Sequence, residues 1–256
     1  MFSPSLVKKE LREQRWLLIT GVLLMTVIGV ASAATYYLLE TFKPLVEAFL
    51  EGPLLEELRF IMSDYTTYLW SQWNPKNLLQ IGTILAILAA APAVAGEWNR
   101  GSLEFLLSRP LRRRTILFSK AISGIVVISI TIWLSTLLML LTAALTGPEP
   151  VAWGKLLGAT ALTNAGLLLV YCLALLCSVF FNDSIKAGAT AAGILFVYSS
   201  LGLFTPTRML SFFYHMRGWQ WFTGQSPYPW LELVVLVAMA AAVFCLAAVI
   251  FEKREY

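Results

Sequence analysis

The chain has 256 residues, of which 58% are hydrophobic and 13% charged, and its formal net charge is +4 at pH 7. So few charges among so many apolar and aromatic side chains exclude a disordered chain, a coiled coil and a small disulfide scaffold, and they predict an integral membrane protein. In such a protein the distribution of charge decides topology, so the basic balance gives no reason to expect a nucleic-acid partner.

Six long stretches without Asp, Glu, Lys or Arg are predicted to cross the membrane as helices, with Glu232 at the mouth of the last one. A hydrocarbon core of roughly 30 Å requires about 20 apolar helical residues. The first stretch lacks a small-residue cleavage site, so we expect an uncleaved span rather than a signal peptide. The sequence predicts an all-α membrane protein, one transmembrane domain over residues 1–256. The stretches cover residues 16–39, 78–96, 121–145, 156–181, 187–204 and 231–251.

Basic residues favour one orientation of these spans. If the N-terminus is cytoplasmic, 13 of the 19 Lys and Arg residues lie in inside segments, and the first outside segment is rich in Glu. The positive-inside rule therefore predicts a multi-pass protein of the cell membrane with both termini in the cytoplasm.

The two segments that flank the first stretch have helical patterns. Residues 1–15 place Leu6, Val7 and Leu11 on one side and basic residues elsewhere. This pattern fits a helix lying along the membrane interface, and it fits a charged flank of the first span equally well. In residues 44–73, apolar and acidic side chains alternate with helical spacing, interrupted at Gly52–Pro53, so we expect two amphipathic helices on the outer face.

The side chains inside the stretches exclude several kinds of function. Ion pumps and proton-coupled carriers need ionisable groups at membrane depth, and these spans contain none. Their hydroxyls are expected to bond between helices, and Asn164 is the one polar group that we predict as a candidate pathway residue. His215 is the sole histidine and no phosphate-binding loop occurs, so we expect no catalytic, cofactor or metal site in this chain.

The longest inside segment, residues 97–120, reads EWNRGSLEFLLSRPLRRRTILFSK. Gly101 frees the chain after the second stretch, and Ser102 can cap a short helix that Pro110 ends. The basic run that follows fits the lipid headgroups. Charge alone would fit an ordinary interfacial loop, so the spacing of the other residues decides the interpretation.

That spacing resembles the cytosolic coupling segment of type-2 ATP-binding-cassette (ABC) exporter permeases, in which Glu-x-x-x-Gly-Thr-Leu-Glu precedes Leu-Leu-x-x-Pro and Arg. Ser102 replaces Thr and keeps the hydroxyl, whereas Arg112 stands where a small polar residue is common. Six spans with both ends inside extend the resemblance beyond this segment. The matching residues are Glu97, Gly101, Leu103, Glu104, Leu106, Leu107, Pro110, Arg113 and Lys120.

The resemblance implies that a short helix over residues 102–109 docks into a groove on a cytosolic ATPase subunit and transmits its movements to spans two and three. It also implies that residues 1–15 form an elbow helix. Phe105 and Leu106 are the expected apolar anchors. The expected coupling residues are Glu97, Gly101, Ser102, Leu103, Glu104, Phe105, Leu106, Arg109, Pro110 and Arg113, with polar contacts from Glu97, Glu104, Arg109 and Arg113.

Residues 205–230 are rich in aromatic side chains, and a membrane-interface belt explains about half of them. Type-2 exporters carry short re-entrant helices at this place, which form an outer gate. The resemblance therefore implies that Phe212, Phe213, Trp219 and Trp221 line a closed external vestibule.

By this resemblance the chain is the permease subunit of an ABC exporter and not itself an enzyme. It implies two permease chains, identical or merely related, and two ATPase chains that bind ATP and Mg. Spans two and five would line the path, and their uncharged faces favour a lipophilic or amphipathic cargo, or a mechanical role, over a small ion. The alternative is a membrane assembly or signalling module that docks a cytosolic partner through residues 97–120.

Overall fold

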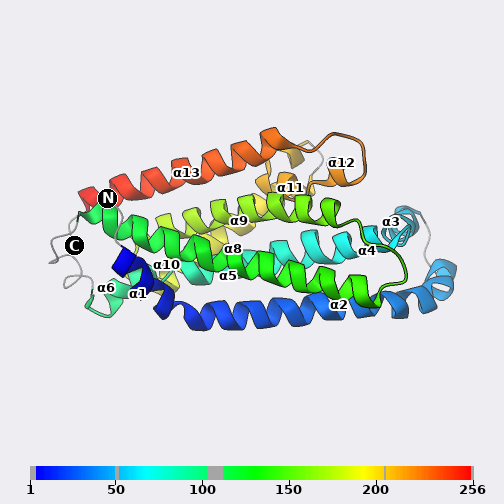
Figure 1. The fold of residues 1–256 in the computed structure, drawn as a ribbon. Coiled ribbons are helices and arrows are strands. Elements are labelled where there is room, and N and C mark those ends of the chain that lie inside the picture. The colour runs from blue at the N-terminus through cyan, green and yellow to red at the C-terminus, as the bar shows by residue number, and fades with distance from the viewer. Residues whose placement is uncertain (1–3, 50–51, 103–111, 205, 255–256) are drawn as a thin grey trace.

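A computed structural model describes residues 4–49, 52–102, 112–204 and 206–254, and these residues form helices and no strand. The long helices run side by side in an elongated bundle (Figure 1). One end of the bundle, here the loop end, holds α1 (Pro4–Glu13), α6 (Ala95–Asn99) and both chain termini; the opposite end, here the aromatic end, holds α3 (Pro53–Ile61), α11 (Phe212–Met216) and α12 (Trp219–Phe222). The all-α prediction is confirmed.

Among the described residues, four helices are long and apolar enough to cross a membrane. They correspond to the first, third, fourth and sixth predicted spans. The first helix continues beyond the predicted end at Leu39, with Pro44 inside it. The four helices are α2 (Arg15–Phe49), α8 (Arg113–Thr146), α9 (Trp153–Phe180) and α13 (Trp230–Lys253).

The other two predicted spans contain shorter helices. The stretch 78–96 is divided among η1 (Gln72–Leu78), α5 (Leu79–Ala90), a turn and the start of α6, and the stretch 187–204 contains most of α10 (Ser184–Ser200) and η2 (Leu201–Leu203). With 12 and 17 residues, α5 and α10 are roughly 18 and 25 Å long, less than the hydrocarbon core. A total of six spans therefore stays a prediction.

The segment between α2 and α5 differs from the two amphipathic surface helices expected in residues 44–73. Gly52, with φ 70°, separates α2 from α3 as predicted. The next helix, α4 (Tyr65–Ser71), is almost wholly buried, capped by Asp64, and leads directly into the π-helix η1. Pro75 lies inside η1 and has no N–H to donate, which explains the irregular hydrogen bonding there. The second expected amphipathic helix, after Gly52–Pro53, is thus divided into α3 and α4, and α4 belongs to the core.

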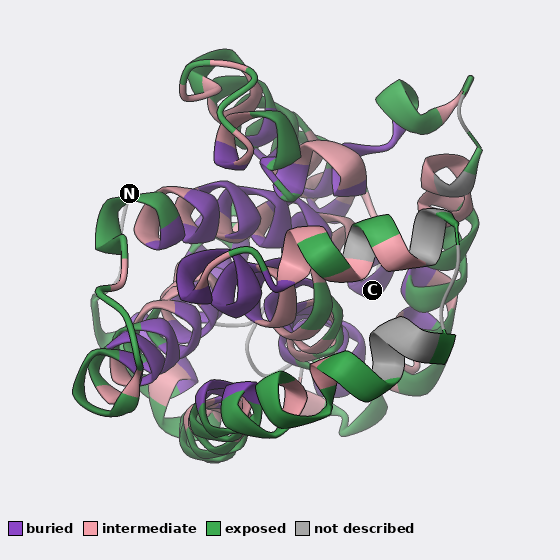
Figure 2. Ribbon diagram, turned by 90° about the vertical axis from the view of Figure 1, so that its right-hand side faces the viewer, coloured by how far each residue is buried: buried purple, intermediate pink, exposed green. Residues whose placement is uncertain are grey.

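Helix α9 lies at the centre of the bundle. In an apolar segment of 18 residues within α9, 78% of the residues are buried, against 22% in the corresponding segment of α2 and 17% in that of α13. It packs against α13, α5, α10 and α8, and Figure 2 shows the buried residues gathered in the middle of the bundle. The outer helices expose large apolar side chains such as Leu23, Val27 and Leu231. Such a surface fits lipid and not water.

Helices α8 and α9 make a close contact at Gly124. A Cβ atom there would lie 2.3 Å from the Tyr171 Oη atom and 2.4 Å from its ring. Tyr171 is fully buried, and its hydroxyl donates to the backbone oxygen of Lys120 over 3.2 Å. Only glycine allows the tyrosine to reach this carbonyl.

We expect Gly124→Ala to destabilise the bundle by about 1–3 kcal/mol, because the added methyl group overpacks the contact with Tyr171. The measurement is the apparent midpoint of thermal unfolding of the purified protein in detergent. Gly193→Ala in α10 is the control, since nothing lies within 4 Å of its added Cβ and alanine favours a helix. Equal midpoints for the two variants would contradict the contact.

Candidate functional site

A buried cluster of charged side chains joins α1, α6 and α8 at the loop end. Lys120 of α8 donates to Oε1 of Glu10 in α1 over 2.8 Å and to Oε1 of Glu97 in α6 over 3.1 Å. The three residues are only 2%, 3% and 4% exposed, respectively. Because isolated buried charges are costly, this lysine holds the two carboxylates, and so the three helices, together.

Local features of the sequence bring these residues to one place. In α1 the buried side chains are Leu6, Val7 and Glu10, so the carboxylate lies on the apolar face that packs on α8. The turn before α6 is held by Ser178 of α9, whose hydroxyl accepts from the backbone nitrogens of Val94 and Ala95 at 3.0 Å each. This bond fixes the place where Glu97 enters the cluster.

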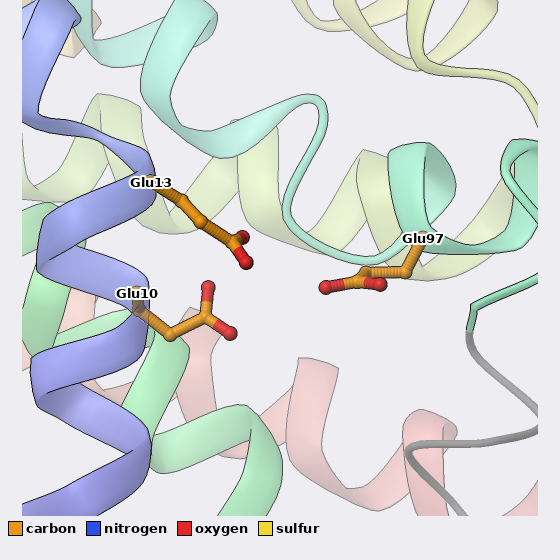
Figure 3. Close-up of side chains that lie close together, drawn as sticks. All are labelled: Glu10, Glu13 and Glu97. Atoms are coloured by element: carbon orange, nitrogen blue, oxygen red, sulfur yellow. The ribbon is translucent and has the colours of Figure 1, made fainter.

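Two further residues extend the cluster toward its surface. Lys9 lies 3.4 Å from Glu97 and 3.2 Å from Glu13, and the carboxylates of Glu10, Glu13 and Glu97 point toward one another (Figure 3). One oxygen of each carboxylate lies within 4.8 Å of the others. The two lysine ammonium groups donate into this group of oxygens, so ion pairing accounts for the close approach of the acids.

The environment strongly favours the charged form of Glu97. Burial alone would raise the pKa of its carboxyl, but the charge of Lys120 and the hydrogen bond from Ser102 outweigh burial and lower the pKa from 4.5 to about 2. Glu97 is therefore an anion at every physiological pH.

Ser102 links the cluster to the segment predicted to couple to an ATPase. Its hydroxyl donates to both a carboxylate oxygen and the backbone oxygen of Glu97. Gly101 has a φ of 68°, a left-handed conformation that glycine adopts without strain. The chain thus leaves α6 by a sharp turn that is tied to the buried carboxylate.

The structure describes four of the ten predicted coupling residues: Glu97, Gly101, Ser102 and Arg113. Glu97 faces inward, and the Arg113 guanidinium donates to the backbone oxygens of Glu252 and Arg254 at 3.3 and 2.5 Å, so both have partners within the chain. The predicted coupling residues Leu103, Glu104, Phe105, Leu106, Arg109 and Pro110 lie outside the described residues.

The four predicted gate residues have different neighbours. Phe212 and Phe213 are buried, stack on each other at 4.3 Å, and Phe212 also stacks on Tyr198 of α10. By contrast, Trp219 packs on Trp70 of α4 at 5.5 Å.

Trp221 lies apart from the phenylalanines as well: it packs on Tyr228 at 4.9 Å and approaches Gly158 of α9. The four side chains therefore do not meet around one space, and their role as a gate stays a prediction. Asn164 is partly buried on α9, where its side-chain oxygen has no hydrogen-bond partner among the described residues; its pathway role also stays a prediction.

Sequence reasoning missed Lys9, Glu10 and Glu13 as members of this site. The signal for Glu10 was present, since it falls four residues after Leu6 and three after Val7, on the apolar face of the first segment. A carboxylate on that face requires a buried cation. Lys120 was part of the predicted coupling motif, but the spacing of that motif did not indicate which residue Lys120 pairs with.

The comparisons with known proteins agree with the resemblance seen in the sequence. The family described as ABC-2 family transporter protein matches residues 5–207. The match includes the whole charged cluster and five of the six predicted spans. No curated protein matches the chain.

We expect Glu97→Gln to lower stability at neutral pH, because a pKa lowered from 4.5 to about 2 corresponds to on the order of 3 kcal/mol. This contribution is complete above pH 4.5 and is lost as the pH falls toward 2, where the carboxylate becomes protonated. The difference in unfolding midpoint between wild type and variant should therefore narrow below pH 4.5. Glu13→Gln is the control, since Glu13 is exposed. A pH-independent difference would contradict the assignment.

Proposed function

The chain belongs to the ABC-2 family of transporter proteins, whose match covers residues 5–207, and from this we propose that it is the membrane-spanning permease subunit of an ATP-driven exporter. As a member of this family it is a multi-pass membrane subunit without its own ATPase, and its sequence contains no phosphate-binding loop. ATP and Mg would bind to separate cytosolic ATPase chains, and each pair of permease chains would carry two such ATPase chains. The family match is the observation that carries the proposal.

The charged cluster supports a coupling role for the loop end. Glu97 bonds to Ser102, the first residue of the predicted docking helix, and to Lys120, seven residues after the start of α8. A push on the loop by an ATPase would therefore reach α1, α6 and α8 together. Closure of the ATPase pair would then switch the cavity between two permeases from inward to outward facing.

The exposed helices support a second permease chain and a lipid environment. Helix α10 exposes Phe196 and Val197, and α2 exposes Leu23 and Val27, so large apolar faces lie outside the single-chain core. We propose that such faces meet lipid and the partner permease in the cell membrane, with both termini cytoplasmic. A lipophilic or amphipathic cargo fits the uncharged spans better than a small ion.

The alternative is a non-transport membrane module that docks a cytosolic partner through the same loop. Purification from native membranes in a mild detergent separates the two functions. An exporter brings with it an ATPase that has a phosphate-binding loop and whose hydrolysis responds to cargo. A partner of any other kind would favour the alternative.

Glu104→Lys tests the docking segment. We expect this charge reversal to abolish ATPase association, or to uncouple ATP hydrolysis from transport, because the coupling motif that residues 97–120 resemble has an acid at this position. Pull-down and hydrolysis assays on the purified assembly measure both. Glu56→Lys in α3, at the opposite end of the bundle, is the matched control. Wild-type association and wild-type coupling in Glu104→Lys would defeat the assignment.

Cysteine labelling tests the outer gate. Phe213→Cys and Trp221→Cys, each in a Cys245→Ser background, should react severalfold differently with an impermeant maleimide when ATP is added to the assembly. The remaining native cysteines, Cys172 and Cys177, are buried. Lys76→Cys, at an exposed position, should label equally with and without ATP. Unchanged labelling at both test positions would count against a gate.

A further inference from the structure

A groove opens between α5 and α10 toward the aromatic end, with α11 along one side. Its volume is about 470 Å³, within the range of pockets that hold small molecules. The groove follows α5 from Leu79 to Ile87 and α10 from Ala192 to Ser200, about 12 Å of each helix. Its apolar walls are formed by Leu79, Ile84, Ile87, Leu195, Phe196 and Phe213.

The charge on the groove is positive and lies at one end. Arg217, directly after α11, is exposed, and it is the only ionised side chain among the residues that line the groove. A second guanidinium, that of Arg208, lies 4.6 Å from the ring centre of Tyr214, another lining residue. No carboxylate is among the described residues that line the groove, so its charged end suits an anion.

A buried hydroxyl also lines the groove, at the other end of the short helix α11 from Arg217. Ser211 lines the groove and is 0% exposed, and its Oγ atom has no hydrogen-bond partner among the described residues. The other hydroxyl side chains of serine and threonine in the groove do have partners. Thr83, Ser199 and Ser200 each donate to a backbone carbonyl of their own helix. Buried hydroxyls are normally satisfied, so Ser211 is available to an acceptor atom that enters the groove.

We propose that this groove binds an amphiphile with an acidic headgroup, whose chain lies between α5 and α10 and whose headgroup is held by Arg217 and Ser211. This inference rests on the proposed function, because it makes the amphiphile the cargo of the exporter. A guanidinium and a hydroxyl are suitable donors to a phosphate or a carboxylate. The chain of an uncharged or cationic amphiphile would also fit between the apolar walls, but its headgroup would give Arg217 and Ser211 no anionic partner.

The test compares two amphiphiles with the same chain, hexadecyl phosphate and hexadecyl phosphocholine. Radiolabelled forms are bound to the native permease–ATPase assembly in nanodiscs of phosphatidylcholine. We expect at least tenfold tighter binding of hexadecyl phosphate, since only its headgroup is free to pair with the guanidinium without an attached cation. Equal binding of the two amphiphiles overturns the proposal.

Variants at the charged end sharpen the test. Arg217→Gln should weaken hexadecyl phosphate binding about tenfold and leave hexadecyl phosphocholine unchanged, whereas Arg217→Lys should keep most of the affinity. Lys76→Gln removes an exposed charge of the same sign that does not line the groove, and it should have no effect. Ala192→Trp, which fills the groove, should weaken both amphiphiles. Wild-type binding in Arg217→Gln overturns the headgroup assignment.

ATP hydrolysis separates failure of this inference from failure of the proposed function. Hexadecyl phosphate should stimulate hydrolysis by the wild-type assembly and not by the Arg217→Gln assembly. Cargo-stimulated hydrolysis without Arg217-dependent binding overturns the groove assignment and leaves the exporter proposal standing. Arg217-dependent binding by a chain that associates with no ATPase supports the groove and overturns the exporter proposal.

Discussion

The buried ion pairs of Lys120 constrain the loop end of the bundle. Removing an ammonium group from water costs several kcal/mol, and the cost is offset only by partners placed at short distance. Here the partners come from two different helices, Glu10 at 2.8 Å and Glu97 at 3.1 Å. The positions of α1 and α6 are therefore set by a charge on α8, and neither helix can move away without leaving a buried ion unpaired.

This constraint has a mechanical consequence along the bundle. Helix α8 has 34 residues, so it extends roughly 50 Å from the loop end to the aromatic end. About two thirds of the way along α8, Thr136 accepts a hydrogen bond from the buried Trp73 of η1 over 2.9 Å. One continuous helix thus contacts the charged cluster in its first turns and the irregular π-helix farther along. A displacement of the loop end by an ATPase would have a continuous path to the segment that leads into α5.

The elements that depended on local pattern could be predicted from the sequence. Long uncharged stretches predict α2, α8, α9 and α13, because length and apolarity are properties of consecutive residues. The spacing of Glu97 and Gly101 also predicted the family. The pairing of Glu10 with Lys120 could not be predicted, since the two residues lie 110 positions apart and no periodic pattern connects them. The burial of α4 was missed for a related reason: the alternation of apolar and acidic residues over 44–73 fits a surface helix until the neighbouring helices are placed.

The distribution of charge along the bundle bears on what can be moved. The loop end holds Lys120, Glu10 and Glu97 in internal ion pairs, the predicted spans contain no Asp, Glu, Lys or Arg apart from Glu232 at the mouth of the last, and Arg217 stands at the aromatic end of the groove. An ion that crossed the whole bundle would meet no compensating charge at membrane depth. An amphiphile avoids this cost, because its chain replaces lipid contacts with those of α5 and α10 while its headgroup stays near water and Arg217. The same lack of charge in the spans that argues against an ion carrier therefore favours a molecule whose charge stays at one end.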